Sequence, residues 1–255
     1  MKYRYFIRFS YDGTNYHGWQ VQPNGITVQE KMTSVMQQIF GVDLLLTAAG
    51  RTDSGVHAEM MFAHFDTDIQ IIDTKSMALK LNYMMPFDIA VYDVLPVVKE
   101  AHARFDAISR TYEYRMSPVK NPFNRFFQAR YHDSTNHNPM DLEAMNKAAA
   151  VLLEYTDFTS FSKLHTDVKT NDCCISKAFW EQRGDLLVFT IKADRFLRNM
   201  VRAIVGTMLE VGRGKMDIAG FRAVIEAKDR CLAGTSVDAK GLFLVEIIYP
   251  DSLFL

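Results

Sequence analysis

The chain has 255 residues, enough for one large domain or two small ones, and 48% of them are hydrophobic and 23% charged. This composition excludes a disordered or collagen-like protein. Lys and Arg number 29 against 30 Asp and Glu, so the formal net charge is −1 and gives no sign of a nucleic-acid partner. Three cysteines are too few for a disulfide framework, and the first residues lack the apolar core of a signal peptide. We therefore expect a cytoplasmic protein.

The first hundred residues predict one β-α-β-β-α-β unit. Aromatic and polar residues alternate over Tyr3–Tyr11, which is the period of a strand. Thr27 and Glu30 have the spacing of a capping box and predict a helix that ends near residue 40. Further strands are predicted over 43–49, 57–65 and 89–98, and a second helix over 74–84 with Asp73 or Thr74 as its cap. This order is the ferredoxin-like pattern.

Residues 105–255 predict the same order again. The predicted elements are a strand over 111–116, a helix over 139–155 with Pro139 near its first turn, a hairpin of strands over 175–182 and 186–193, helices over 196–211 and 217–227, and a strand over 242–249. The fold class is therefore α+β. We expect two ferredoxin-like halves, 1–104 and 105–255, joined around a central cleft, with a mainly antiparallel sheet and helices packed on one side. The turn-rich excursion over 118–141 is typical of a functional loop and equally of a tolerated insertion.

The most unusual string is Ala-Gly-Arg-Thr-Asp-Ser-Gly-Val-His-Ala over 49–58, between two predicted strands. Its two glycines allow a positive φ and close backbone approach, while Thr52, Asp53 and Ser54 can each bond nearby backbone groups. Taken alone, the string fits an ordinary hairpin turn. Two charged residues and a histidine in one tight turn favour a functional loop instead.

Residues 110–115 have the alternating pattern of a strand and form a second candidate functional segment. The alternation places Tyr112 and Tyr114 on one face of a predicted strand beside arginines. Exposed aromatic rings beside arginines suit stacking on nucleic-acid bases. A half-buried structural strand explains the same pattern.

Three arginines, Arg195, Arg198 and Arg202, are spaced i, i+3 and i+7, so they would form one stripe on a helix. Gly206 continues this stripe and allows a ligand or another backbone to approach closely. The stripe faces either solvent or an anionic polymer.

Together these strings resemble the tRNA pseudouridine synthase A family along essentially the whole chain. The string over 49–58 is similar to the family's catalytic signature, AGRTDxGVHA, which is highly specific. The other matching strings are Tyr11-Asp12-Gly13, Gly18-Trp19-Gln20, Val28-Gln29-Glu30, Ala103-Arg104-Phe105, Arg110-Thr111-Tyr112, 157–161, Met200-Val201-Arg202, Gly206-Thr207 and Gly241-Leu242.

The resemblance implies an isomerase that converts uridine to pseudouridine in the anticodon stem-loop of tRNA, at positions 38, 39 and 40. It implies a homodimer with tRNA bridging the subunits, and no cofactor or metal. Residues 169–174, where many members carry a basic residue, read Lys-Thr-Asn-Asp-Cys-Cys and put one RNA contact in doubt.

The resemblance also assigns roles to five residues. Asp53 would be the catalytic nucleophile, because a carboxylate can stabilise or trap the positive charge that grows on a sugar when its glycosidic bond breaks. Whether it attacks the sugar, attacks the uracil or removes a sugar proton stays open. Arg202 would pair with the aspartate, and Tyr112 would pack on the target uracil. Leu242 would form an apolar wall of the pocket, and Arg51 would contact the RNA and help expose the base.

Two other functions are weighed against this one. A non-catalytic RNA-binding protein with RRM-like halves would share the topology, but neither predicted central hairpin carries the RNP1 string. A glycosidase would need a second carboxylate, and Glu59 is the nearest in sequence to Asp53.

The charge is unevenly distributed along the chain. Residues 104–130 and residues 192–215 each carry six basic and two acidic side chains, a net of +4 for each segment. The remainder carries 17 basic and 26 acidic side chains, a net of −9, which restores the total of −1. Two basic segments in an acidic protein can guide an RNA to one face, so the neutral total does not exclude a polyanionic partner.

Overall fold

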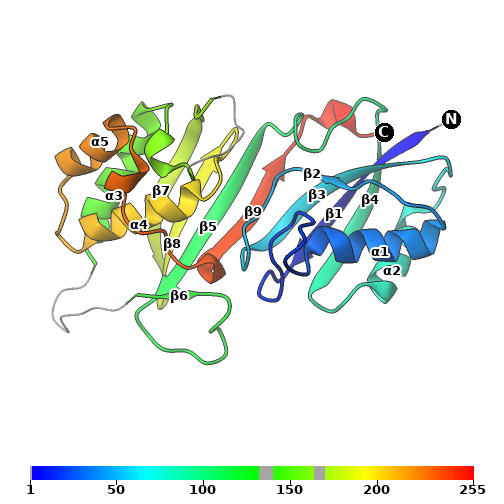
Figure 1. The fold of residues 1–255 in the computed structure, drawn as a ribbon, viewed down its shortest axis with the longest axis horizontal. Helices are drawn as coiled ribbons and strands as arrows, with labels where there is room; N and C mark the ends of the chain where they lie inside the picture. The colour runs from blue at the N-terminus through cyan, green and yellow to red at the C-terminus, as the bar shows by residue number, and fades with distance from the viewer. Residues whose placement is uncertain (1, 132–139, 164–169) are drawn as a thin grey trace. The chain divides into compact units, whose positions relative to one another are not determined.

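The computed structural model describes residues 2–131, 140–163 and 170–255 (Figure 1). The fold is α+β with mainly antiparallel strands, as the sequence predicts. The chain forms two compact units, the first made of Met1–Arg110 with Leu244–Leu255 and the second of Thr111–Phe243. It passes from the first unit to the second within β5 (Ser109–Ser117) and returns within β9 (Leu242–Ile248).

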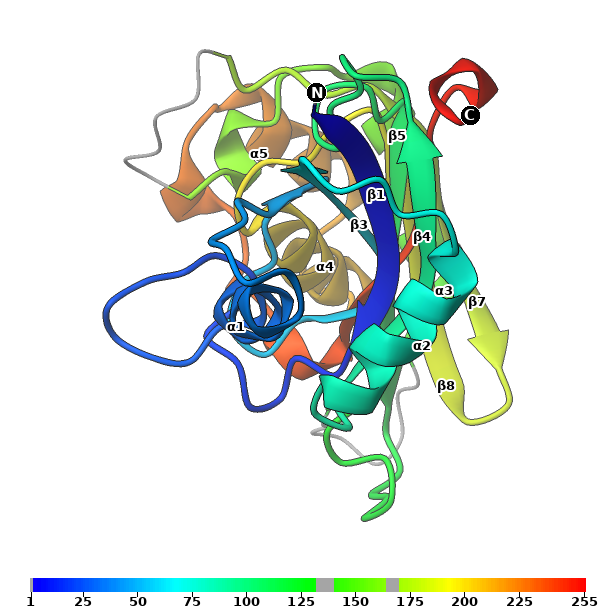
Figure 2. The same ribbon diagram turned by 90° about the vertical axis from the view of Figure 1, so that its right-hand side faces the viewer.

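The first unit has the predicted β-α-β-β-α-β order. Its strand β1 lies between β3 and β4 and is antiparallel to both, with Ile7 opposite Ala63 on one side and Val94 on the other (Figure 2). The order continues from β3 to β9, and α2 packs against β4. The elements are β1 (Tyr3–Tyr11), α1 (Val28–Phe40), β2 (Thr47–Ala48), β3 (His57–Thr67), α2 (Thr74–Met84), β4 (Ile89–Val97) and the 3₁₀ turn Asp251–Leu253.

Local sequence signals explain where the first helices begin. The Thr27 hydroxyl accepts the Glu30 N–H at 3.3 Å, and the Glu30 carboxylate accepts the Thr27 N–H at 3.4 Å, which confirms the predicted capping box of α1. Asp73 caps α2 by accepting the Ser76 N–H at 2.9 Å. These caps fix the residues at which the two helices begin.

The predicted strand over 43–49 is wrong in length, because only Thr47–Ala48 pair with β3. Leu44 and Leu46 are buried and Leu45 is exposed, so the alternation that suggested a strand is real. The Leu46 carbonyl, however, accepts the Gln29 side-chain amide of α1 at 2.9 Å instead of a strand neighbour. A hydrogen bond from a helix side chain therefore takes the place of strand pairing at this position.

A buried histidine on β3 gives the first unit a pH-dependent stability. His64 Nδ1 accepts the Ala103 N–H at 3.1 Å, and burial, with help from His102 and Arg4, lowers the pKa of His64 to about 4. In the unfolded chain this imidazole is protonated below about pH 6.5. Stability from the neutral His64 is therefore fully present above about pH 6.5 and is lost as the pH falls towards about 4.

We expect His64→Gln to weaken this pH dependence, because the glutamine side chain does not titrate. Urea unfolding of wild type and variant at about pH 7 and about pH 5 measures the effect. The wild type should lose more stability between the two pH values than His64→Gln does. Parallel losses in the two proteins would contradict the assignment to His64.

The second unit, completed by β9, repeats the order with one added helix and one added two-residue strand. In it β8 lies between β5 and β7, the β7–β8 hairpin turns at Gly184 with φ +60°, and α3, α4 and α5 pack against one another. Its elements besides β5 and β9 are β6 (Ala129–Arg130), α3 (Leu142–Val151), β7 (Ile175–Arg183), β8 (Leu186–Ala193), α4 (Met200–Gly212), α5 (Ile218–Glu226) and the 3₁₀ turns Leu152–Glu154, Thr159–Phe161, Arg230–Leu232 and Ala239–Gly241. No helix in the described part of the chain is long and apolar enough to cross a membrane.

Two predicted helices of this unit start too early. The helix predicted over 139–155 begins after Asp141, whose carboxylate accepts the Ala144 N–H at 2.9 Å, and its last turn is 3₁₀; Pro139 lies outside the described residues. The helix predicted over 196–211 begins at Met200, because Asn199 takes a left-handed conformation with φ +65°.

This later start changes the arginine stripe. Arg195 and Arg198 precede α4, so the predicted stripe of three arginines on one helix is wrong and only Arg202 lies on α4. The expected close approach at Gly206 is confirmed, since a Cβ there would lie 1.9 Å from the Thr235 carbonyl oxygen.

Candidate active site

The loop between β2 and β3 carries Asp53 and packs on the segment that follows β1. At Gly13 an added Cβ would lie 2.0 Å from the Val56 carbonyl oxygen. Gly18 has φ +82°, and an added Cβ there would lie 2.4 Å from the Thr52 carbonyl oxygen. The two backbones therefore touch at both places, which only glycine permits.

Backbone hydrogen bonds fix the same loop. The Tyr16 carbonyl accepts both the Gly55 N–H and the Ser54 hydroxyl at 3.2 Å, and the Val56 N–H closes the turn on the Asp53 carbonyl at 3.1 Å. Tyr16 is itself held, because its hydroxyl donates to Asp88 Oδ1 at 2.6 Å. This hydrogen bond and burial raise the pKa of the Tyr16 hydroxyl.

Two buried side chains complete the frame. The hydroxyls of Thr52 and Tyr11 share a hydrogen bond of 2.8 Å. His57 Nδ1 accepts the Gly13 N–H at 3.1 Å and lies 3.1 Å from Asp12 Oδ1. Asp12 also accepts the Thr14 N–H at 2.9 Å, so Asp12-Gly13 forms a turn.

The charged side chains of the loop are at least partly exposed, while residues next to them in the sequence are buried. Thr52 and Val56 are buried, Asp53 is half-buried and Arg51 is exposed. An ordinary hairpin tip would not be enclosed in this way. The loop is a fixed platform that holds one carboxylate at a partly accessible position.

The other predicted site residues belong to the second unit. Tyr112 is half-buried on β5, and its ring meets Phe196 edge to face with centroids 5.1 Å apart. Tyr114 is buried, its hydroxyl donates to the Asp238 carbonyl at 3.0 Å, and burial raises its pKa. The prediction of two tyrosines available for base stacking on one face is therefore wrong for Tyr114, which is part of the core.

Arg202 and Leu242 are placed by packing of the second unit. Arg202 Nε donates to the Val237 carbonyl at 2.7 Å, and the Val237 N–H donates to the Arg202 carbonyl at 3.2 Å. The Gly206 contact with Thr235 holds the same segment against α4. Leu242 is buried where β9 begins.

Sequence reasoning missed Tyr16, Asp88 and Phe196. Tyr16 and Asp88 are 72 residues apart, and no local pattern links them. Phe196 was taken as part of a helix, whereas it lies in the turn before α4 and meets Tyr112. In each case the signal is a contact between distant segments.

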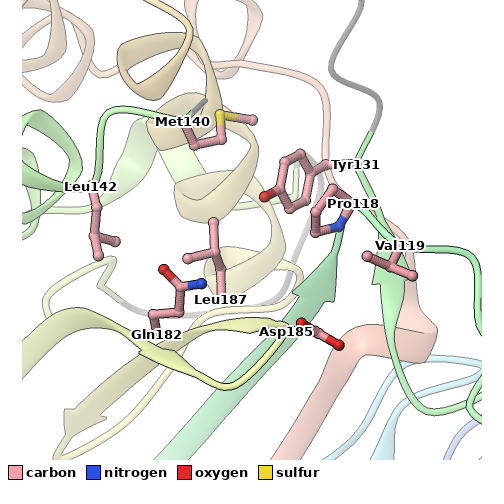
Figure 3. A pocket seen from close by; sticks show the side chains of 8 residues that line it. All are labelled: Pro118, Val119, Tyr131, Met140, Leu142, Gln182, Asp185 and Leu187. Carbon is pink, nitrogen blue, oxygen red and sulfur yellow. The ribbon is translucent and has the colours of Figure 1, made fainter. Parts of the chain in front are cut away.

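A separate hollow of about 190 Å³ lies in the second unit, between the ends of the excursion, the β7–β8 turn and the start of α3 (Figure 3). It contains none of the predicted site residues; its lining is Pro118, Val119, Tyr131, Met140, Leu142, Gln182, Asp185 and Leu187. Within the described residues, no three His, Cys, Asp or Glu side chains gather into a metal-binding group.

Comparison with known proteins defines the class. A family profile described as tRNA pseudouridine synthase matches residues 148–250. Proteins named tRNA pseudouridine synthase A are similar over nearly full length: one from Parabacteroides distasonis is 58% identical and one from Bacteroides fragilis 55% identical, each over 98% of both chains. One from a Geobacillus species is 39% identical over 98% of this chain and 100% of its own. The chain belongs to the tRNA pseudouridine synthase A family.

Proposed function

We propose that this enzyme converts uridine to pseudouridine in the anticodon stem-loop of tRNA, at positions 38, 39 and 40, with Asp53 as the catalytic nucleophile. Its class, an isomerase of the tRNA pseudouridine synthase type, follows from the family. Membership of that class favours the pseudouridine synthase function over a non-catalytic RNA-binding protein with RRM-like halves and over a glycosidase. The observation that carries the proposal is the enclosed Asp53 loop, whose backbone is held on both sides while the carboxylate stays partly accessible.

The reaction is an isomerisation. The N1–C1′ bond of the nucleotide breaks, the uracil turns, and C5 forms a bond to C1′. C5 then gives up its proton and N1 gains one, so no atom is lost overall and nothing is oxidised. The sugar gains positive charge as the first bond breaks, and a fixed carboxylate can stabilise or trap it. Because the Asp53 loop is held in advance, little reorganisation is needed when the charge develops.

The remaining site residues receive supporting roles. Tyr112 packs on the target uracil, and its edge-to-face contact with Phe196 orients the ring. Stacking of a base on an aromatic ring contributes about 1–3 kcal/mol, which helps offset the few kcal/mol needed to flip the base out. Exposed Arg51 contacts the RNA, and Leu242 forms an apolar wall of the uracil pocket.

Partners and organisation complete the proposal. The substrate is a tRNA in the cytoplasm, bound by a homodimer through the basic segments 104–130 and 192–215. The functional halves are residues 1–104 and 105–255. The complete β-α-β-β-α-β order within each range supports this division.

We expect Arg202→Ala to lose most of the activity, about 10²-fold or more, because a cation that pairs with Asp53 would be removed. Single-turnover rates on tRNA measure the loss. Arg202→Lys keeps the charge and should recover part of the rate. An unchanged rate in a folded Arg202→Ala protein would contradict the pairing.

The product test uses one tRNA transcript and one variant of it. Incubation with the enzyme should leave the mass of the tRNA unchanged, release no free uracil, and form pseudouridine only where a uridine is present at position 38, 39 or 40. A transcript with cytidines at all three positions should remain unmodified. Released uracil would indicate a hydrolase, and pseudouridine outside the anticodon stem-loop would contradict the proposed specificity.

A further inference from the structure

A buried arginine holds the first residue of the catalytic string. The Arg110 side chain is only 9% exposed, and its guanidinium donates to three backbone carbonyls of the first unit. Nη2 donates to the Ala49 oxygen at 3.0 Å and to the Arg104 oxygen at 2.5 Å, while Nη1 donates to the Ala107 oxygen at 3.0 Å. From these contacts we propose that Arg110 is a positioning residue that sets the entry of the Asp53 loop.

The entry of the loop depends on this contact. The Ala49 N–H donates to the Phe62 carbonyl of β3 at 2.8 Å, so the sheet fixes one side of this peptide and Arg110 fixes the other. The next residue, Gly50, has open space around it, since an added Cβ would meet nothing within 4 Å. The far side of the loop rests on Tyr16, but the near side is held at the Ala49 carbonyl.

The other two carbonyls belong to a second segment of the first unit. Arg104 and Ala107 belong to the segment that leads into β5, and Arg110 stands on β5 two residues before Tyr112. One side chain therefore ties the start of the Asp53 loop to the segment that precedes the proposed uracil-packing tyrosine.

Arginine suits this position because its five N–H donors form a rigid planar fork that can serve several carbonyls at once. Lysine places three donors on one flexible atom and cannot reproduce the fork. Burial also separates this role from that of an RNA contact, which requires an exposed side chain such as Arg51.

The test compares Arg110→Ala and Arg110→Lys with the wild type, and it rests on Asp53 being the catalytic residue. We expect Arg110→Ala to lower kcat about 10²-fold, the effect of a displacement of about 1 Å at a catalytic group, while Kd for tRNA changes less than about threefold. Guanidinium chloride at millimolar concentration should restore at least a tenth of the lost rate, because the free ion can occupy the vacated site between the carbonyls. Arg110→Lys should remain well below the wild type.

Arg4→Ala is the matched control. Arg4 is a half-buried arginine of the first unit; like Arg110 it donates to a backbone carbonyl, that of Ala101 at 2.9 Å, and it also pairs with Asp66. Its loss should lower the melting temperature but leave kcat unchanged, with no effect of guanidinium. Methylammonium chloride at equal ionic strength controls for salt effects on RNA binding.

Three outcomes would overturn the proposal. They are a wild-type kcat in folded Arg110→Ala, a wild-type kcat in Arg110→Lys, and rescue by methylammonium as strong as rescue by guanidinium. If Arg110→Ala does not fold, Arg110→Lys decides alone. Asp53→Asn, assayed alongside, separates the two hypotheses: an active Asp53→Asn overturns the proposed function, whereas an inactive Asp53→Asn beside a fully active Arg110→Ala overturns only the role of Arg110.

Discussion

Asp53→Asn is expected to abolish pseudouridine formation, with kcat reduced by about 10⁴-fold or more, the scale on which enzymes lose activity when a residue acting directly on the substrate is removed. The amide has the same shape as the carboxylate but carries no charge to stabilise or trap the sugar. The loop should survive the change, because backbone hydrogen bonds, the Thr52 and Ser54 hydroxyls and the His57 ring also hold it. Single-turnover conversion of tRNA measures the loss of activity, and filter binding measures the affinity for tRNA.

Binding of tRNA should change little in the same variant, since the proposed phosphate contacts come from basic side chains elsewhere. Asp68→Asn is the matched control, because Asp68 is an exposed aspartate of the same unit outside the loop. It removes the same charge and should leave both conversion and binding unchanged. Conversion by Asp53→Asn at the wild-type rate would exclude Asp53 as the nucleophile.

Gly18→Ala is expected to have a large effect on both activity and stability, through the backbone that supports the loop. A left-handed φ of +82° costs a non-glycine residue about 1–2 kcal/mol. The new Cβ would also lie 2.4 Å from the Thr52 carbonyl oxygen, so the Asp53 loop must move away. We expect a loss of about 10²-fold in kcat together with a lower free energy of unfolding.

Gly41→Ala separates the two contributions. Gly41 has nearly the same conformation, with φ +71°, but an added Cβ would meet nothing within 4 Å. Its substitution should lower the free energy of unfolding by the conformational term alone and leave kcat unchanged. Equal losses of kcat in the two variants would show that strain, and not displacement of the Asp53 loop, is responsible. Urea unfolding and single-turnover rates of both proteins decide this.

Sequence reasoning succeeded where a signal is local. The capping box of Thr27 and Glu30 and the alternation over Tyr3–Tyr11 depend on neighbours within a few residues, and the structure confirms both. The family signature over 49–58 located the loop that the structure encloses. Its chemical role came from resemblance, because a turn with an aspartate has no pattern of its own that indicates catalysis.

Sequence reasoning failed where contacts with distant segments decide the local structure. The alternation over 43–49 predicted a longer strand, but Gln29 of α1 takes the Leu46 carbonyl that a strand neighbour would have used. The i, i+3, i+7 spacing of three arginines gave no sign that Asn199 would turn left-handed and delay the helix. Likewise, nothing near Arg110 in the sequence indicates that its guanidinium reaches the Ala49 carbonyl, 61 residues away.

The central claim is that Asp53, held by this loop, converts uridines of the anticodon stem-loop. Nucleotide-resolution mapping of pseudouridine in one tRNA, after saturation with either wild type or Asp53→Asn, tests it most directly. The account predicts pseudouridine at positions 38, 39 or 40 with the wild type and none with Asp53→Asn, although both proteins occupy the tRNA. Conversion of the same uridines by Asp53→Asn, or wild-type product only outside the stem-loop, would contradict it.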